Sequence, residues 1–349
     1  MQLDSLEIIR RRDPEDALGV IANSYTQLNF PAELQQADSG NFQPANIVLS
    51  GMGGSCLAGL IANRWLRHDY NLNLPFEVSR EYTVPEYVNN KSLVIIFSVS
   101  GNTEETLSSL DDALSKRAHV VVITSGGKLL ERAQSEQLPY IVLDKISQPR
   151  YGVFMHLRAI TKVLEHYNIL HGAFDELSDS ADFVKNYANK LTALIPFDRN
   201  AAKQLALSCT GKTVLVFASS WFYPLAYKWK TSFNENAKNI IWCNEFPEFN
   251  HNEFIGWTEQ PVEKPFCVVS LRSNLDSERV NKRFDLSEQL LSGKRPHSHN
   301  VQLTGDTYIK QAICGAILGD FTSIYLAISN NIDPTPVPLV EKFKHLLVQ

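Results

Sequence analysis

A glycine-rich stretch between an apolar run and a helical pattern constrains the fold of this chain more than any other feature. The run 46–49 is typical of a buried strand, and the pattern that begins at Leu57 continues as a helix. Between them lies Gly51-Met52-Gly53-Gly54-Ser55. A strand that turns through glycines into a helix points free backbone N–H groups and the positive end of the helix dipole at one spot. The stretch therefore predicts an anion site, to which the Ser55 hydroxyl would add a donor.

A second loop of this kind follows a later apolar strand. It runs Ser98-Val99-Ser100-Gly101-Asn102-Thr103, and Glu104-Glu105 then open a helix, where acidic residues suit the dipole. In a parallel sheet both loops would lie at the carboxyl ends of strands, where such folds bind ligands. A third loop, 124–128, has a similar composition. Two hydroxyl-rich helix N-termini that meet there predict a compact pocket for a phosphate monoester.

Two other interpretations of the first loop stay open. A dinucleotide site would need Gly or Ala where Cys56 stands, and an acidic residue at the next strand end, where the chain has Val78-Ser79-Arg80. In the second interpretation, the glycines serve only to make a tight turn between strand and helix. This would account for the glycines but not for the hydroxyl residues around them.

Apolar strands alternate with helical stretches in both halves of the chain. We expect strands at 46–50, 76–79, 93–98, 119–124, 140–144, 214–218, 240–243, 266–271 and 299–303. We expect helices at 56–68, 103–117, 127–136, 223–237, 276–291, 306–330 and 339–347, with leading helices in 1–38 and only helical periodicity over 153–208. This predicts an α/β fold of two doubly wound parallel-sheet domains with a helical linker and a C-terminal helix. We place the domains at 1–150 and 151–349.

Bulk composition excludes several classes of protein. A net charge of −5 argues against a general nucleic-acid binder. The five cysteines are an odd number with no Cys-x-x-Cys, which indicates reduced thiols in the cytoplasm and no zinc signature. Arg10-Arg11-Arg12-Asp13 interrupts the N-terminal segment, and no apolar run approaches the roughly 20 residues of a membrane span. We expect a cytoplasmic protein with no nucleic-acid or membrane partner, no metal and no cofactor.

Polar residues in the second half suggest chemistry on a phosphosugar. Asn234-Glu235-Asn236-Ala237-Lys238 ends a helical pattern, and Asn250-His251-Asn252-Glu253 follows a strand. Aldose–ketose isomerisation needs proton transfer to open the ring and a base that moves a proton between carbons 2 and 1 through an enediol. A carboxylate and an imidazole can supply both. Taken singly, Glu235 could be a surface residue and His251 a packing residue, and His251 with Glu253 lacks a third metal ligand at a recognised spacing.

The loops and these segments together resemble a known family. Gly53-Gly54-Ser55 with Ser98-x-Ser100-Gly101-Asn102-Thr103-x-x-Thr106 resembles the sugar isomerase (SIS) domain, which binds phosphosugars. The segments 234–238 and 250–253, a partial Gln148-Pro149-Arg150 element, and the closing Gly319-Asp320-Phe321 and Asp333-Pro334-Thr335-Pro336-Val337 resemble the bifunctional phosphoglucose/phosphomannose isomerases. The resemblance covers nearly the whole chain and implies SIS-type αβα domains.

The resemblance implies roles for individual residues. Glu235 would be the base, and His251 would assist ring opening from the neighbouring subunit of a homodimer. Arg150 would stabilise the enediolate, Lys344 would be a second ring-opening partner, and Thr335 would line the sugar end of the pocket, where a small residue admits both epimers. The phosphate ligands would be Gly54, Ser55, Ser98, Ser100 and Thr103.

Other functions of such domains differ in recognisable ways. A non-catalytic phosphosugar sensor would bind the same ligands and turn nothing over, and it usually carries a partner or DNA-binding module, which we do not expect here. An aminosugar-phosphate synthase would need a glutamine-hydrolysing domain with an N-terminal cysteine, and Gln2 follows Met1. We therefore expect the isomerase. For the basic segment 276–300 we expect a mobile surface loop around its helix.

Overall fold

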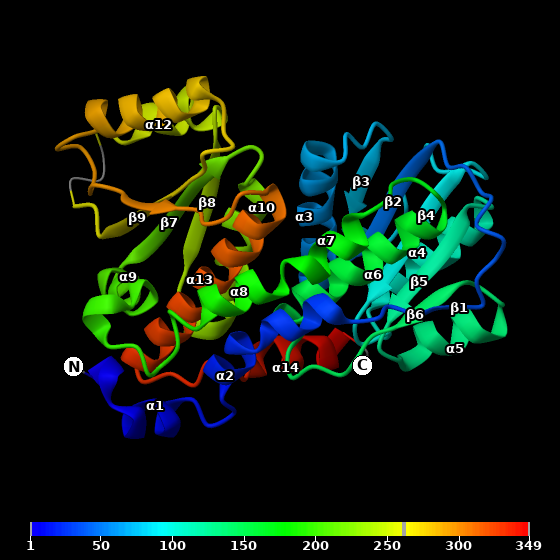
Figure 1. The fold of residues 1–349 in the computed structure, drawn as a ribbon, viewed down its shortest axis with the longest axis horizontal. Helices are drawn as coiled ribbons and strands as arrows, with labels where there is room; N and C mark the ends of the chain where they lie inside the picture. The colour runs from blue at the N-terminus through cyan, green and yellow to red at the C-terminus, as the bar shows by residue number, and fades with distance from the viewer. Residues whose placement is uncertain (1, 260–262, 348–349) are drawn as a thin grey trace. The chain divides into compact units, whose positions relative to one another are not determined.

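The computed structural model describes residues 2–259 and 263–347, which group into two compact units (Figure 1). The first unit comprises residues 24–183, and the second comprises residues 1–23 together with 184–349. We expected the leading helices in the first domain and residues 151–183 in the second. The contacts instead group residues 1–23 with the second unit and residues 151–183 with the first. The domain boundary at residue 150 stays a prediction, and each unit is described by itself below.

The first unit is built on a six-stranded sheet with strand order β1-β6-β5-β4-β2-β3. All neighbours are parallel except β1, which pairs antiparallel with β6. The strands are β1 (Leu34–Gln35), β2 (Asn46–Gly51), β3 (Phe76–Ser79), β4 (Ser92–Ser98), β5 (His119–Thr124) and β6 (Tyr140–Val142). The five expected strands of this half are confirmed, whereas the two-residue β1 was not expected.

Helices cover both faces of this sheet because successive side chains of each strand point to opposite sides. Val48, Val94 and Val120 are paired across neighbouring strands and pack in one core cluster with apolar residues of α4 and α5. On the other face, Leu49 lies against Gly59 of α3 and Phe97 against an aromatic ring of α6. The helices of this unit are η2 (Ser24–Asn29), α3 (Gly53–Asp69), α4 (Glu104–Ser115), α5 (Gly127–Ser135), η3 (Pro149–Tyr151), α6 (Val153–His166), α7 (Ala173–Asp179) and α8 (Ala181–Ala188), the last of which crosses into the second unit.

The chain reverses its direction across the sheet between β2 and β4. From β2 it crosses to β3 on one side, and it then returns to β4 on the other side of β2 before continuing to β5 and β6. The loops after β2 and β4 therefore leave the sheet side by side and in opposite directions, and doubly wound folds commonly bind ligands at this point of the strand order.

The second unit repeats this plan with a four-stranded parallel sheet in the order β10-β9-β7-β8. Its strands are β7 (Thr213–Ser219), β8 (Ile241–Phe246), β9 (Phe266–Arg272) and β10 (His299–Gln302). Its helices are η1 (Gln2–Asp4), α1 (Leu6–Arg12), α2 (Ala17–Ala22), η4 (Phe197–Arg199), α9 (Ala201–Cys209), α10 (Tyr223–Ser232), η5 (Phe233–Ala237), η6 (Glu248–His251), α11 (Glu253–Gly256), α12 (Glu278–Leu290), α13 (Tyr308–Ser329) and α14 (Pro338–Leu347). The two doubly wound parallel sheets confirm the expected fold class.

Helix α13 corrects one expectation about apolar runs. Its 22 residues are long and apolar enough to cross a membrane by length and composition, but 94% of its most apolar window is buried within the protein. The core helix of a soluble protein passes the same test. The helix is apolar because it packs against α9 and α10 inside the protein.

The first loop of the second sheet is filled by aromatic side chains. Phe222 is buried and stacks on Tyr308 at 4.6 Å between ring centroids, and the Tyr308 hydroxyl donates to the Trp221 carbonyl at 2.6 Å. A phosphate would have to displace these rings. The described side chains therefore fill this loop of the second sheet.

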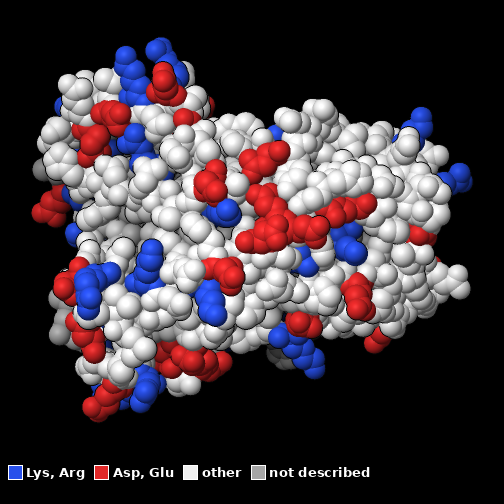
Figure 2. Space-filling model, viewed as in Figure 1, with Lys and Arg blue, Asp and Glu red and all other residues white. Residues whose placement is uncertain are grey.

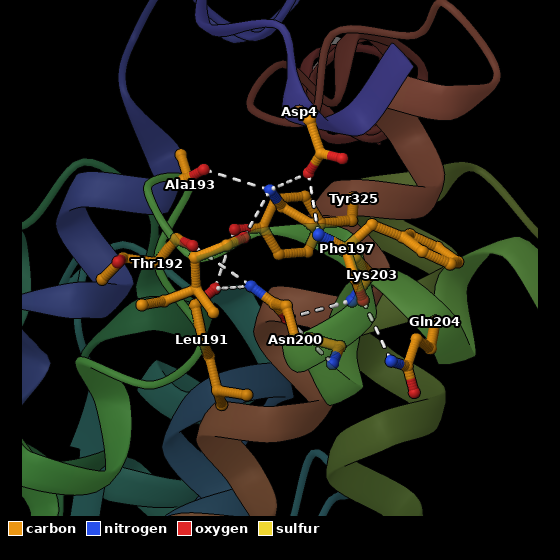
Figure 3. Close-up of polar contacts among 11 residues, drawn as sticks. Asp4, Leu191, Thr192, Ala193, Phe197, Asn200, Lys203, Gln204 and Tyr325 are labelled. Atoms are coloured by element: carbon orange, nitrogen blue, oxygen red, sulfur yellow. Dashed lines mark hydrogen bonds and ion pairs between the residues drawn. The ribbon is translucent and has the colours of Figure 1, made fainter. Parts of the chain in front are cut away.

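A buried lysine holds the N-terminal segment against the rest of the second unit (Figure 3). The Lys203 side chain is fully buried, and its ammonium group donates to the Asp4 carboxylate at 3.0 Å and to the carbonyls of Ala193 and Ile195 at 3.0 and 2.8 Å. Asn200 caps α9 beside it by accepting from the backbone N–H groups of Ala202 and Lys203. Three acceptors around one ammonium group satisfy its donors, which makes burial of the charge tolerable.

Candidate functional site

The loop after β2 turns directly into α3, so the glycines form the first turn of the helix instead of preceding it. Gly53 has a φ of +54°, and a Cβ on Gly54 would lie 2.8 Å from the Pro149 carbonyl oxygen. Only glycine permits that approach at residue 54. Ser55, 4% exposed, lies in the same first turn. The side chain of Met52, the N-cap residue, makes no capping hydrogen bond to the N–H groups of this turn.

The loop after β4 gathers three hydroxyl groups. The Ser98 hydroxyl lies 2.8 Å from that of Thr103 and 3.5 Å from that of Ser100, and it accepts from the backbone N–H of Gly101 at 3.2 Å. Thr103 is the N-cap residue of α4, yet its side chain makes no capping bond. The hydroxyls are therefore turned toward one another at a helix N-terminus, an arrangement that suits several oxygens of one anion.

The loop after β5 braces the second loop. Ser125 donates to the Val99 carbonyl through its backbone N–H at 3.1 Å and through its hydroxyl at 2.5 Å. The N–H of Leu129 donates to the Gly101 carbonyl at 2.9 Å. A Cβ on Gly101 would lie 1.7 Å from the Gly126 carbonyl oxygen, so the two loops touch backbone to backbone. This third loop resembles the other two in composition, but its polar groups support the second loop.

Arg150 lies beside the first loop. The Pro149 carbonyl and the Arg150 nitrogen are the atoms nearest to a Cβ built on Gly54, so η3 packs on the start of α3. The Arg150 side chain is buried, donates to the Gln148 amide oxygen at 3.0 Å, and lies with its guanidinium carbon 4.7 Å from the centre of the Tyr151 ring. The backbone of residues 149–150 therefore contacts the first loop, while the Arg150 guanidinium group lies against Gln148 and Tyr151.

A histidine that the sequence analysis missed lies beneath both loops. His156 of α6 is fully buried, and its ring packs edge-on against Phe97 at 5.0 Å and under Gly152. Burial lowers the pKa of His156 to about 3, and the nearby Gly54 backbone offsets part of that shift. Neither ring nitrogen reaches a residue within the described ranges in the geometry of a hydrogen bond. A lone histidine in an apolar helical pattern gave no signal that it would lie under a glycine loop.

Glu235 lies on a π-helical turn in the second unit. Helix α10 continues directly into η5, and Lys238 ends the turn in a left-handed conformation with its N–H on the Phe233 carbonyl. π-helical turns are rare and occur frequently at functional sites. The Glu235 side chain is half-buried, between buried neighbours at Phe233 and Asn236.

The segment that carries Thr335 is fastened to the end of this turn. The Lys238 ammonium group donates to the carbonyls of Asp333 and Pro334 at 2.7 and 3.3 Å, and the Thr335 N–H donates to the Asp333 carboxylate at 3.0 Å. Thr335 is 2% exposed. The structure thus brings the chain around Glu235 and the chain around Thr335 together.

His251 lies at the exposed end of η6, on a segment that α12 holds in place. The neighbouring Asn250 donates to the Ser287 hydroxyl at 2.8 Å and accepts from Arg283 at 3.2 Å. Glu253 accepts from Asn244 at 2.8 Å and from Trp257 at 3.4 Å, so its carboxylate is already engaged. The His251 side chain is exposed and makes no hydrogen bond with any other described residue.

The basic segment 276–300 makes more ion pairs than we expected of a surface loop. Residues 278–290 form the expected helix α12, and the turn after it is pinned by Glu288, which pairs with Arg295 at 3.0 Å and with His297 at 2.9 Å. Arg295 is 9% exposed. The expectation of a mobile surface loop missed these contacts because ion pairs across a turn leave no periodic pattern in the sequence.

Lys344 lies on α14 and pairs with Glu341 at 3.0 Å, both side chains being about two-thirds exposed.

The first unit brings together the loops of the expected phosphate ligands and Arg150, and the second brings together the segments of Glu235 and Thr335. Within the described residues, no three His, Cys, Asp or Glu side chains are placed to hold a metal ion. The individual roles of these residues stay predictions.

The pKa of His156 predicts a pH dependence of stability. The unfolded chain binds a proton at His156 below pH ~6.5 but the folded chain does not, so the free energy of unfolding falls as the pH is lowered toward 3. We expect this group to cost about 2 kcal/mol between pH 7 and pH 5. Urea unfolding at the two pH values measures the loss, and His156→Phe is expected to remove it. The exposed His171, changed to Gln, serves as the control, and an unaltered loss in His156→Phe would contradict the prediction.

Family models match both parts of the chain. The model described as the SIS domain matches residues 42–162, and the model described as the bacterial phospho-glucose isomerase C-terminal SIS domain matches residues 198–347. In fold, the chain is similar to the crystal structure of a glucose-6-phosphate isomerase like protein from Thermus thermophilus, with a TM-score of 0.64 at 17% identity over 97% of this chain and 99% of that one.

Similar curated proteins narrow the family. A bifunctional phosphoglucose/phosphomannose isomerase from Aquifex aeolicus (strain VF5) is 33% identical over 302 residues, which cover 86% of this chain and 90% of that protein. One from Caldicellulosiruptor bescii is 30% identical over 92% of this chain and 97% of its own length. The chain belongs to the family of bifunctional phosphoglucose/phosphomannose isomerases.

Proposed function

We propose that this protein interconverts glucose 6-phosphate and mannose 6-phosphate with fructose 6-phosphate through an enediol. The observation that carries the proposal is the half-buried carboxylate of Glu235 on a π-helical turn fastened to the Thr335 segment. Similar proteins from Aquifex aeolicus and Caldicellulosiruptor bescii are named for both activities. The two aldoses differ only at carbon 2 and share one enediol with the ketose, so one base can serve both.

The hydroxyls of the first unit would hold the phosphate. Ser55 and the Ser98, Ser100 and Thr103 group supply donors at two helix N-termini, and the dipoles of α3 and α4 favour an anion there. The net charge of −5 gives no long-range attraction for an anion, so recognition depends on this local set of donors. The phosphate would fix the substrate so that its reacting carbons come to one place on every binding event.

Each proposed catalytic group has one proton or charge to handle. Glu235 would take the proton from carbon 2 and return it to carbon 1, while His251 and Lys344 would transfer protons during ring opening. The negative charge that develops on the enediolate would be stabilised by the buried guanidinium of Arg150. No step of this sequence calls for a metal or an organic cofactor.

Replacing the base tests the reaction. Glu235→Gln is expected to lower kcat by about 10²–10⁴-fold, because it removes the general base but keeps the shape of the side chain. The measurement is a coupled assay for fructose 6-phosphate, run separately from each aldose phosphate with EDTA present. Glu278→Gln makes the same chemical change at an exposed carboxylate in the same unit and is expected to keep wild-type turnover.

The assay also separates the two candidate functions. Phosphosugar binding by the wild-type protein without turnover of either aldose would identify a non-catalytic sensor. Turnover that Glu235→Gln retains in full would leave the isomerase but remove Glu235 as its base.

A larger side chain at Thr335 is expected to separate the two activities. Thr335 is buried, so Thr335→Leu would take space from the pocket and lower kcat/KM for one epimer by about 10–200-fold more than for the other, with mannose 6-phosphate the more affected. Thr335→Val keeps the volume and removes only the hydroxyl, so it distinguishes size from hydrogen bonding. Full mannose 6-phosphate turnover by Thr335→Leu would rule out this role for the residue.

We also propose that the protein is a cytoplasmic homodimer in which each subunit supplies His251 to its neighbour's site. The exposed imidazole of His251, with exposed apolar side chains at Trp242 of β8 and Ile255 of α11, supports an interface on these segments. The five cysteines form no disulfide, as is usual in a reducing compartment.

Complementation between two inactive variants tests the shared site. If His251 acts across the interface, a mixed dimer of Glu235→Gln and His251→Ala subunits has one intact site and one site with both changes. Unfolding and refolding the two variants together is then expected to restore about a quarter of wild-type activity, since half of the dimers are mixed and each has one working site. Activity that stays at the level of the single variants would place His251 in its own subunit's site or outside the reaction.

A further inference from the structure

Helices α10 and α13 pack together in one defined register. A Cβ on Gly315 would lie 2.6 Å from the Leu225 side chain, and one on Gly319 would lie 2.6 Å from the Trp229 ring. The Trp229 indole N–H also donates to the Gly315 carbonyl at 2.8 Å. Each glycine of α13 therefore receives one large side chain of α10, and a slide of either helix would drive these side chains into backbone.

A buried ion pair continues this contact toward the π-helical turn. The Lys228 ammonium group donates to Asp320 Oδ1 at 2.5 Å and to the Ser232 hydroxyl at 2.7 Å, and that hydroxyl donates to the same carboxylate oxygen at 2.6 Å. The Lys228 side chain is 1% exposed and that of Asp320 is 5% exposed. Three polar groups thus form a closed triangle between the two helices.

Stability alone does not explain this triangle. Burying two charges costs as much as or more than their attraction returns, and apolar side chains of similar volume are commonly as stabilising or more so. Asp320 is the one acidic residue in the 22 residues of α13, where an apolar residue would otherwise fit. The best-attested use of such a pair is to fix the register of packed helices.

The register that the triangle fixes is that of the turn carrying Glu235. Ser232 is the last residue of α10 and immediately precedes the π-helical turn. On the far side of Glu235, the Asn236 amide donates to the Ser323 hydroxyl at 2.9 Å, and that hydroxyl donates to the Asp320 carbonyl at 2.8 Å. Contacts to the same short stretch of α13 therefore hold the chain on both sides of Glu235.

The phase of this turn decides where the carboxylate points. An α-helix turns about 100° per residue, and a π-helical turn accommodates one extra residue. If the extra residue were accommodated one position earlier or later, the side chain at 235 would leave the helix in a different direction. The contacts of Ser232 and Asn236 with α13 define where the turn begins and ends.

We propose that the buried Lys228–Asp320–Ser232 triangle is a positioning device for Glu235, holding the π-helical turn in the phase that aims the carboxylate at the reacting carbons. This inference rests on the proposed isomerase function, in which Glu235 is the base. The triangle residues contact neither substrate nor proton in this scheme. They act through Glu235, and their loss would therefore affect proton transfer in preference to phosphosugar binding.

The test replaces the pair with apolar residues of similar length, in Lys228→Met/Asp320→Leu. We expect this double variant to unfold at or above the wild-type temperature, since the buried charges are gone. We expect kcat to fall by about 10²-fold, as for a misplacement of about 1 Å, with KM for glucose 6-phosphate nearly unchanged. With glucose 6-phosphate deuterated at carbon 2, the isotope effect on kcat is expected to rise, because proton transfer becomes slower than the other steps.

Lys203 offers a matched control, being a second buried lysine in an ion pair of the same unit (Figure 3). Its partners belong to the N-terminal segment and the 193–195 loop and not to the π-helical turn. Lys203→Met is expected to lower the unfolding temperature but to leave kcat per folded molecule and the isotope effect at their wild-type values. Ser232→Ala, a smaller change, is expected to raise the isotope effect in the same direction as the double variant.

Hydrogen exchange gives a readout that does not depend on turnover. In the double variant, amides of 233–237 are expected to exchange faster while those of the β7–β9 ladder keep their protection. Wild-type kcat, isotope effect and exchange in a folded double variant would overturn the positioning role, and if that variant fails to fold, the same three results for Ser232→Ala would overturn it. A wild-type protein that turns over no sugar phosphate would instead overturn the proposed function. In that case hydrogen exchange still tests the triangle, because unchanged exchange of amides 233–237 in the double variant would show that the triangle does not hold the turn.

Discussion

The reversal of the chain between β2 and β4 is the constraint on which the first unit depends. Because β3 and β5 lie on opposite sides of this strand pair, no helix connects the two strands directly. The loops after β2 and β4 consequently leave adjacent strand ends in opposite directions, and both lead into helix N-termini. The strand order thus creates the position at which we propose that an anion binds, and the hydroxyls of Ser55, Ser98 and Thr103 would be its ligands.

The second unit has the same strand plan but uses it differently. Aromatic stacking of Phe222 on Tyr308 occupies the loop at its corresponding strand end. Its polar groups are instead gathered at the end of α10, where the helix widens into a π-helical turn. The proposed phosphate ligands thus lie in one unit and the candidate base in the other, although both units are built on the same strand plan. On the face drawn in Figure 2, Lys and Arg are dispersed and Asp and Glu gather near α7.

Local sequence patterns predicted the elements well, because strand and helix periodicities are short-range properties. The nine expected strands are present, and their glycine and hydroxyl loops lie at strand ends as anticipated. Contacts between distant segments left no such pattern. Three features depend on which helix lies over which loop. They are the hydrogen bonds from Ser125 to Val99, the contact of the Arg150 backbone with Gly54, and the burial of His156. Asp320 in a long apolar helix was a visible anomaly, but its partner Lys228 could be identified only from the packing of α10 on α13.

The third loop of the first unit has a consequence for the thermodynamics of the proposed anion binding. Two bonds from Ser125 to Val99 and one from Leu129 to Gly101 tie the backbone of the second loop to that of the third. The conformational entropy of that loop is therefore lost when the chain folds and not when an anion arrives. Because the loop is already ordered, less of the interaction energy with a small anion is spent on ordering it, and more of that energy appears as binding affinity. The same rigidity means that the second loop cannot be reshaped for a bulkier ligand group unless the third loop changes with it.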